Sequence, residues 1–368
     1  MPNETAQDSQ ASFQMNIIHI ANFGFKGPGG IKTVVEHLAK WQTTIGHSVC
    51  VGLTLRHEIC DTDNMFVHCP KVKDFRQLIH SERPNIVIFH GVFNLTFFLF
   101  SLWCRWHKIP YCITMHGAGT AVSLQDRHRK KVLALWLFVN HFVSHAAGLI
   151  FLCEGEIKNN TLARLNPKQY IITNGIEAIY EIPSKKAHTP VRFIFLGRIV
   201  YYEKSIDILL KVFALLQQRG DEQKLRFTFY GPRYDDSLIH DIQPYSSFVS
   251  WHEPVYDHDK IEALADNDIF ILVSRSEGMP IGVLEALSCG TPCLVTPQTN
   301  MADLIINANA GWVTSLEPEE IVDSMLQACD DCQSRYEQLR VNALNAIKDY
   351  TWDAIAAQSI ETYKLIIK

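Results

Sequence analysis

Two glutamates and the start of a helix form the stretch of this chain whose residue types best suit chemistry. Glu277 lies in a polar loop after an apolar strand, and Glu285 lies eight positions later, about one turn inside a helix. Both carboxylates can face one crevice, and the first amides of a helix lack partners inside it and suit an anion. This favours a ligand that combines hydroxyl groups with phosphate. Spacing alone equally allows two solvated charges near a helix N-terminus.

Two basic residues, Arg198 and Lys204, lie in a loop after an earlier strand of the same half. Taken singly, each is more often a surface residue than a ligand. Loops at the carboxyl ends of parallel strands gather at one edge of a sheet, so we expect both cations near the two glutamates. Two cations and a helix N-terminus can hold a diphosphate and stabilise charge as it leaves.

The first half opens with a strand, a glycine-bearing loop and a helix. Apolar residues 15–21 predict the strand, and residues 31–43 carry apolar side chains on one helical face. Gly29 and Gly30 would let a backbone approach a phosphate, but the loop lacks the G-x-G-x-x-G spacing, so a flexible turn is an equal interpretation. His116 follows a later strand and would face the same cleft if two domains close on each other. Alone, it would be a structural histidine.

Strands alternate with helices through both halves, which predicts an α/β fold with two doubly wound, Rossmann-like parallel sheets facing a cleft. A polar, proline-bounded segment is the best linker. The predicted organisation is a disordered tail at 1–14, a first domain at 15–182, a linker at 183–190, a second domain at 191–348, and a terminal helix at 349–368 that packs back on the first domain. The predicted strands are 15–21, 49–53, 85–89, 109–115, 147–152, 170–172, 191–196, 225–230, 248–251, 269–273 and 292–295.

Composition limits the classes of partner and the compartment. A chain of 368 residues with a formal net charge of -5 has no bulk attraction for nucleic acid. The polar first fourteen residues lack a charged leader and an apolar segment, so we expect a cytoplasmic protein. Most of the ten cysteines lie in apolar runs, which favours buried free thiols.

Two short motifs give only weak evidence for a metal-binding site. Cys329 and Cys332 form a C-x-x-C pair without a second pair of ligands, which does not favour zinc or redox use. Asp61-Thr62-Asp63 is a D-x-D string, and three-residue matches of this kind arise readily by chance. We therefore expect no metal site.

Two apolar stretches of the first half raise the question of a membrane. Residues 86–103 are interrupted by His90, Gly91 and Asn94, so a buried core is the better interpretation. Basic residues 127–131 lead into apolar residues 132–139, which would suit an anionic membrane surface. The alternative, which we favour, is that the apolar side is core and the basic end is solvated.

Several motifs together resemble a known family. Gly197-Arg198 with Lys204 six residues on, and EGMPIGVLEALSCGTPCLVT at 277–296, resemble the retaining nucleotide-sugar glycosyltransferases of family 4 (glycosyl transferases group 1), which have the GT-B fold. The resemblance covers about residues 15–368. Four further segments match the family pattern: GPGGIKTVVEHLAKWQTTIGHSVCV at 27–51, Thr114-Met115-His116-Gly117, Thr173-Asn174-Gly175-Ile176 and Tyr350-Thr351-Trp352-Asp353.

The resemblance implies roles for single residues. Arg198 and Lys204 would hold the donor diphosphate, Glu277 would contact the donor sugar, and Glu285 would bind the ribose hydroxyls. His116 would lie near the reacting carbon. The other donor-binding residues that the resemblance implies are Gly29, Gly30, Gly278, Met279, Pro280, Ile281, Gly282 and, in the base-reading loop, His252.

One departure concerns the residue after Lys204. The family usually has glycine there, and this chain has Ser205, so the backbone of the loop is expected to differ slightly. The residues that would face the acceptor have no motif to carry over.

The resemblance further implies a reaction. A sugar would pass from a UDP- or GDP-sugar to an acceptor hydroxyl by front-face attack, with the departing phosphate supplying acid–base help and with no cofactor or metal. The acceptor would be a cell-surface polysaccharide or lipid-linked glycan, and the enzyme would work in the cytoplasm or at the inner face of the plasma membrane. Two alternatives remain, a sugar-nucleotide epimerase of similar fold and a non-catalytic nucleotide-sugar-binding subunit.

Overall fold

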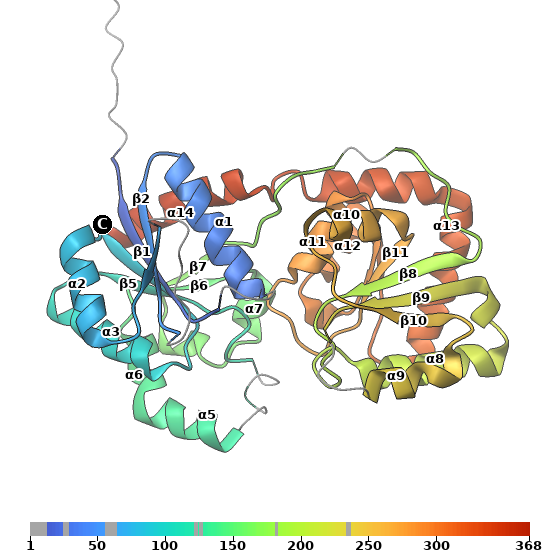
Figure 1. Cartoon of the computed structure of the whole chain (residues 1–368), viewed down its shortest axis with the longest axis horizontal. Coiled ribbons are helices and arrows are strands. Elements are labelled where there is room, and N and C mark those ends of the chain that lie inside the picture. The colour runs from blue at the N-terminus through green and yellow to red at the C-terminus, as the bar shows by residue number, and fades with distance from the viewer. Residues whose placement is uncertain are drawn as a thin grey trace, which may run out of the picture.

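The computed structural model describes residues 13–24, 29–55, 65–120, 124, 128–180, 183–232 and 237–368. Most of the predicted tail and the Asp61-Thr62-Asp63 string lie outside the described residues. Two α/β halves lie side by side, each with a central sheet between layers of helices (Figure 1). The predicted fold class is confirmed.

The first sheet has seven strands in the order β3-β2-β1-β4-β5-β6-β7, all parallel. The order reverses between β1 and β4, and open parallel sheets bind ligands beyond the carboxyl ends of strands at such a point. The strands are β1 (Asn16–Ala21), β2 (Ser48–Leu53), β3 (Phe66–His68), β4 (Ile86–His90), β5 (Tyr111–Thr114), β6 (Gly148–Phe151) and β7 (Gln169–Ile171).

The second sheet has six parallel strands in the order β10-β9-β8-β11-β12-β13, which reverses between β8 and β11. The loop with Arg198 and Lys204 follows β8 and the loop with Glu277 follows β11, so the reversal separates these two loops. The strands are β8 (Val191–Leu196), β9 (Leu225–Tyr230), β10 (Val249–His252), β11 (Ile269–Leu272), β12 (Cys293–Val295) and β13 (Gly311–Val313).

Helices cover both faces of each sheet, so central strands such as β4, β6 and β11 are fully buried and read as continuous apolar runs. In the first half the helices are α1 (Gly30–Thr44), α2 (Val72–Glu82), α3 (Leu95–Trp106), α5 (His128–Ala134), the π-helix η1 (Leu135–Val139), α6 (Asn140–Ser144), α7 (Glu154–Lys158) and the 3-10 helix η2 (Ala163–Leu165). In the second half they are α8 (Ile206–Arg219), η3 (Glu222–Lys224), α9 (Ser237–Ile242), η4 (Gln243–Tyr245), α10 (Asp257–Asp266), α11 (Ile281–Ser288), η5 (Pro297–Thr299), α12 (Ala302–Ala308) and α13 (Pro318–Ala346), and the chain ends with α14 (Trp352–Ile367).

The terminal helix α14 crosses from the second half and packs on the first (Figure 1). Trp352, Ile355 and Tyr363 share one apolar core with Met15 and Ile17 at the start of the first sheet. The last residues of the chain therefore complete the core of its first domain.

The proline-bounded segment at 183–190 is fastened to the second half. Lys185 Nζ donates to the carbonyls of Ala265 at 2.7 Å and Asn267 at 3.1 Å. The amide of His188 donates to Asp268 at 3.1 Å. These bonds hold the segment against α10 and the strand that follows it.

The apolar segment at 132–139 differs from the interpretation that we favoured. Val132, Leu133, Trp136 and Leu137 are exposed by 46%, 56%, 78% and 57%, so much of its apolar side is not core. Only part of the segment, including the fully buried Val139, packs inward. In the described part of the chain, no helix has the length and apolar character needed to cross a membrane.

The nine described cysteines are free thiols, and all but Cys153 are buried. Cys329 and Cys332 both lie on α13. Burial raises the pKa of Cys329 to about 12, so this thiol is protonated and unreactive at neutral pH.

Candidate functional site

Lys204 and Glu277 meet across the point where the strand order of the second sheet reverses. The Lys204 ammonium donates to Glu277 Oε1 in an ion pair. Both side chains are largely buried, with 13% and 11% exposed. A buried pair of this kind needs close geometry, which loops fixed on neighbouring strands provide.

Arg198 belongs to the same group through a carboxylate that sequence reasoning missed. Glu203 Oε1 lies 3.8 Å from Arg198 Nη2 and 3.6 Å from Lys204 Nζ. Arg198 is half-exposed, so it is free to turn toward an incoming anion. The only sequence signal for Glu203 was its place next to Lys204.

Arg275 ties the two loops together and was also missed. Its guanidinium donates two bonds to Asp207 and one to the Tyr202 carbonyl, each at 2.7 Å. The guanidinium also lies 4.4 Å from the Tyr202 ring centroid. Hydrogen bonding to Arg275 lowers the pKa of Asp207, so this carboxylate stays ionised.

Ser205, the departure from the family pattern, adopts the left-handed conformation that glycine takes without strain, at φ 56° and ψ 35°. The loop therefore keeps a glycine-like shape at this residue. Its buried Oγ has no hydrogen-bond partner among the described residues. Serine at this position costs stability twice, through the backbone and through the hydroxyl.

The N-terminus of α11 stands beside the Lys204–Glu277 pair. Pro280 is the residue before the helix, no side chain caps it, and no acidic residue lies in the first turn. The first amides of a helix have no acceptor within it, so this end suits an anion. Gly282 allows close packing, since an added Cβ would lie 3.3 Å from the Phe270 ring.

Glu285, one turn further along α11, is paired with Lys260 of α10. Lys260 Nζ lies 2.5 Å from Glu285 Oε1, and the Glu285 side chain is 17% exposed. Burial raises the pKa of Glu285, and Lys260 opposes that rise. Sequence reasoning missed Lys260, which lies 25 residues away on another helix.

His116 lies in a turn of the first half with φ +49°. Glu156 holds this turn, because its carboxylate accepts from the amides of Gly117 at 2.5 Å and Leu152 at 2.7 Å. His116 Nε2 lies 2.8 Å from His90 Nδ1. Burial lowers the pKa of His116 to about 4, so the ring is neutral at neutral pH.

The His116 turn rests on the Glu277 loop of the other half. An added Cβ on Gly117 would lie 3.4 Å from the amide nitrogen of Gly278. Asn174 Nδ2 donates to the Met279 carbonyl at 2.7 Å. The structure therefore brings Lys204, Glu277 and Gly278 together with His116.

Three predicted residues, Gly29, Gly30 and His252, lie on other elements, at the start of α1 and the end of β10. Gly29 is the residue before α1 and Gly30 is its first, and an added Cβ on Gly30 would meet nothing within 4 Å. His252 ends β10, is exposed, and stacks on Tyr230 with centroids 5.0 Å apart. Their predicted roles stay predictions.

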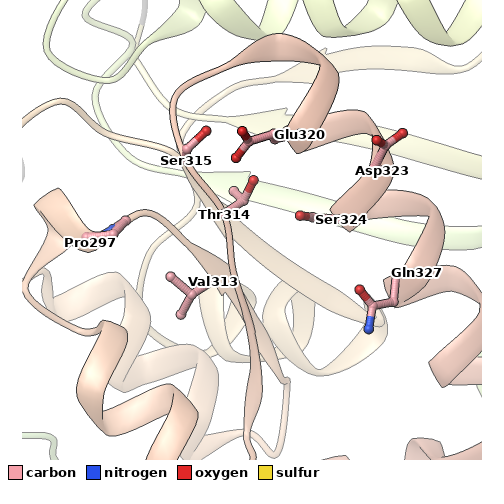
Figure 2. A pocket seen from close by; sticks show the side chains of 8 residues that line it. All are labelled: Pro297, Val313, Thr314, Ser315, Glu320, Asp323, Ser324 and Gln327. Carbon is pink, nitrogen blue, oxygen red and sulfur yellow. The ribbon is translucent and has the colours of Figure 1, made fainter.

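Two open cavities lie near this region, and neither is lined by Arg198, Lys204, Glu277 or Glu285. One, of about 600 Å³, borders Val255 and Tyr230 beside the predicted base-reading loop. The other, of about 420 Å³, lies between β13 and α13, and its hydroxyl and carboxylate groups face one another (Figure 2). It is lined by Pro297, Val313, Thr314, Ser315, Glu320, Asp323, Ser324 and Gln327.

One group of side chains among the described residues has the spacing of metal ligands. His258, Asp259 and Glu262 lie exposed on α10. None of them belongs to the predicted site, and exposed acidic groups of this kind are common without an ion.

Comparison with known proteins finds a glycosyltransferase family match in each half of the chain. The family described as "Glycosyl transferase 4-like domain" matches residues 29–162, and "Glycosyl transferases group 1" matches residues 190–331. The D-inositol 3-phosphate glycosyltransferase of Paenarthrobacter aurescens (strain TC1) is 27% identical over 177 residues, covering 46% of this chain and 43% of that protein. The chain thus matches less than half the length of this relative.

Two longer matches cover nearly the whole chain. The phosphatidylinositol N-acetylglucosaminyltransferase gpi3 subunit of Schizosaccharomyces pombe (strain 972 / ATCC 24843) is 22% identical over 378 residues, covering 94% of this chain and 80% of that protein. The structure of Anabaena Alr3699/HepE in complex with UDP-glucose has a TM-score of 0.72 at 14% identity, covering 96% of this chain and 100% of that one. At that identity the structural likeness shows the fold.

Proposed function

This chain belongs to the GT-B glycosyltransferases, and we propose that it moves a sugar from a nucleoside diphosphate sugar to an acceptor hydroxyl with retention of configuration. The observation that carries the proposal is the Lys204–Glu277 pair, set beside the open N-terminus of α11 at the strand-order reversal. Cation, carboxylate and amides are the groups that a sugar diphosphate needs at one place.

Three groups of the protein supply positive charge near the phosphate end of the donor. Lys204 and Arg198 both lie within 4 Å of the Glu203 carboxylate, so an entering diphosphate competes with that carboxylate for them. The first amides of α11 add the positive end of a helix dipole. These groups stabilise the charge that develops on the leaving phosphate, and in this proposal they make a metal ion unnecessary.

The hydroxyl groups of the donor meet the two glutamates. Glu277 keeps one oxygen on Lys204 and offers the other to a hydroxyl of the transferred sugar. Glu285 is engaged through Oε1 by Lys260, which leaves Oε2 for the ribose hydroxyls. Lys260 also opposes the rise in the pKa of Glu285 that burial causes, which favours the ionised form that accepts hydrogen bonds.

UDP-glucose is the first donor to test, because a solved structure with the same fold holds it. The proposed acceptor is a lipid-linked or cell-surface glycan, since the name of the fission yeast relative specifies a phosphatidylinositol substrate.

A lipid-linked acceptor requires contact with a membrane, and one face of the first half suits it. On α3, Leu95, Leu99 and Trp106 are exposed by 55%, 42% and 82%, at spacings that place them on one helical face. On α5 and η1, Val132, Leu133, Trp136 and Leu137 are exposed as well. These seven residues, with Leu102, form what we call the apolar face.

The two parts of the apolar face lie on neighbouring helices, since the rings of Phe98 in α3 and Phe138 in η1 lie 5.7 Å apart. Exposed Arg105, Lys108 and Lys130 belong to the same helices and their ends. Apolar and basic side chains together fit an anionic lipid surface. The proposed place of work is therefore the inner face of the plasma membrane.

The test combines binding and turnover. UDP- and GDP-sugars are screened for thermal stabilisation, where a donor at a hundred times its Kd adds about 2.7 kcal/mol. The stabilising donor is then incubated with lipid-linked acceptors, with and without chelator, and the anomeric configuration of the product is read by NMR. Inverted product, or strict dependence on Mg²⁺, would contradict the proposal. An isomerised sugar nucleotide formed without acceptor would favour an epimerase, and binding without any product would favour a non-catalytic subunit.

A further inference from the structure

Three histidines form a diagonal row across the first sheet, two on the neighbouring strands β1 and β4 and the third in the turn that follows β5. His19 of β1 is in register with Ile88 of β4, and His90 lies two residues beyond, on the same face. His90 is in register with Thr114 of β5, and His116 follows two residues later in the turn. The ring nitrogens lie 2.9 Å apart between His19 and His90 and 2.8 Å apart between His90 and His116.

The inner end of the row is anchored by two helices that are far apart in sequence. Ser359 of α14 donates its hydroxyl proton to the Ala356 carbonyl at 2.6 Å. Its oxygen therefore accepts from Gln42 Nε2 of α1, at 2.9 Å. This turns Gln42 Oε1 toward His19 Nε2, at 2.8 Å. An amide oxygen only accepts, so His19 must donate from Nε2.

The direction of the hydrogen bond between His19 and Gln42 determines the direction of the next two hydrogen bonds in the row. Burial lowers the pKa of His19 and His116 to about 4 and that of His90 well below its usual value, so each ring is neutral at pH 7 and carries one proton. His19, protonated on Nε2, accepts through Nδ1 from His90 Nε2. His90 then accepts through Nδ1 from His116 Nε2. The proton of His116 lies on Nε2, and Nδ1 keeps its lone pair.

The geometry points to a directed hydrogen-bond relay in which Ser359 and Gln42 are positioning residues for His116. The relay holds the His116 proton on Nε2 and presents Nδ1 as a hydrogen-bond acceptor. Within the described part of the chain, Nδ1 has no protein partner. The His116 turn rests on the Glu277 loop, so a ligand in that site supplies the donor.

An acceptor nitrogen selects among the groups of a sugar nucleotide. It takes a hydrogen bond from a hydroxyl, whereas a phosphate oxygen offers no proton at neutral pH. His116 therefore contacts a sugar hydroxyl rather than the diphosphate. This assignment of the contact rests on the proposed function, whereas the relay rests on the fold alone.

The first measurement is the tautomer itself. Protein labelled with ¹⁵N-histidine is examined by long-range ¹H–¹⁵N correlation at pH 7, and His116 is assigned among the 16 histidines by its loss in His116→Gln. The expected result is a protonated Nε2 and an unprotonated Nδ1. A His116 ring protonated on Nδ1, or on both nitrogens, overturns the relay whether or not an activity has been found.

The second measurement uses variants remote from the site. Ser359→Ala removes a hydrogen-bond partner that orients the Gln42 amide, and Gln42→Leu removes the amide. Both are expected to populate the Nδ1-protonated tautomer of His116. The matched control is Thr362→Ala, which removes an exposed hydroxyl bonded within the same helix. It is expected to leave the tautomer unchanged, and circular dichroism checks that all variants are folded.

The third measurement tests whether the relay affects the rate of sugar transfer. Ser359→Ala is expected to lower kcat/KM about fivefold, as the loss of one neutral hydrogen bond predicts. Altered tautomers with unchanged kinetics would overturn the sugar contact, and unchanged tautomers in both variants would overturn the positioning role. Absence of any transferase activity would refute the proposed function and leave the NMR result to decide the relay.

Discussion

Arg275 donates two parallel hydrogen bonds to Asp207, each at 2.7 Å, and so joins the loop after β11 to the first turn of α8. The two loops that carry Glu277 and Lys204 are thereby held at a fixed separation. Neither partner belongs to the motifs by which the donor site was predicted. The site depends on a support that is not itself expected to contact the donor.

Replacing Arg275 by Lys tests this support. A lysine keeps the charge but loses the two-pronged geometry, so donor KM is expected to rise about tenfold, on the order of 1.4 kcal/mol. The control is Arg192→Lys, whose partner Asp266 is exposed and lies outside the predicted site. Steady-state kinetics with the stabilising donor gives the comparison. Equal effects of the two substitutions would show that Arg275 has no special role.

Loss of the Lys204 ammonium is expected to act on the chemical step. Lys204→Met removes a cation next to the departing phosphate, so kcat should fall by about 10² to 10³. Lys211→Met on the exposed face of α8 is the control, with an expected change below about twofold. Single-turnover rates separate chemistry from binding. A rise in KM with normal kcat would mean that Lys204 only binds.

Ser205→Gly is expected to stabilise the protein by about 1 kcal/mol, because it relieves the left-handed backbone and the unpartnered hydroxyl. Ser205→Ala removes the hydroxyl and keeps the backbone strain, so it separates the two contributions. Urea unfolding of the three proteins measures them. If Ser205→Ala stabilises as much as Ser205→Gly, the backbone is not the cause.

The histidine row predicts sensitivity to acid. The pKa values of His19 and His116 are lowered in the fold from 6.5 to about 4, so the unfolded chain takes up protons first as pH falls. Their stability contribution is complete above pH 6.5 and is lost between about pH 6.5 and 4. At pH 5 the loss is about 2 kcal/mol for each ring.

Unfolding by urea at pH 7 and pH 5 checks this expectation. His19→Gln should flatten the pH dependence while lowering stability at pH 7. His258→Gln, at an exposed position, should leave the dependence as it is. An unchanged slope in His19→Gln would show that another group causes the acid sensitivity.

The apolar face predicts binding to anionic vesicles. Trp106→Ser with Trp136→Ser removes the two most exposed aromatic rings of that face and should weaken sedimentation with phosphatidylglycerol vesicles by at least about tenfold. Ile306→Ser, at a site 61% exposed on α12 of the other half, serves as the control. Vesicle binding that persists in the double variant would place the contact elsewhere.

The strands and the final helix were predictable because their signals are local. Apolar runs predicted the bounds of β8 and β9 to the residue, and the terminal helix predicted at 349–368 corresponds to α14 at 352–367. The edge strands β3 and β13 were missed because each has only three residues and little apolar pattern.

The partners inside the site were harder to predict. Gln42 and Ser359 are 317 residues apart, and Lys260 reaches Glu285 from another helix, so only tertiary packing joins them. The exposure of Trp136 was missed because periodicity gives the apolar side of a helix without showing what covers it.

The return of α14 to the first half has a consequence for biogenesis. Domains generally fold in the order in which they leave the ribosome. Here Met15 and Ile17 lack their core partners Trp352, Ile355 and Tyr363 until the whole second half has been translated. The first half therefore stays open along one face until α14 leaves the ribosome, and a premature stop before Trp352 would destabilise the first domain as well as the second.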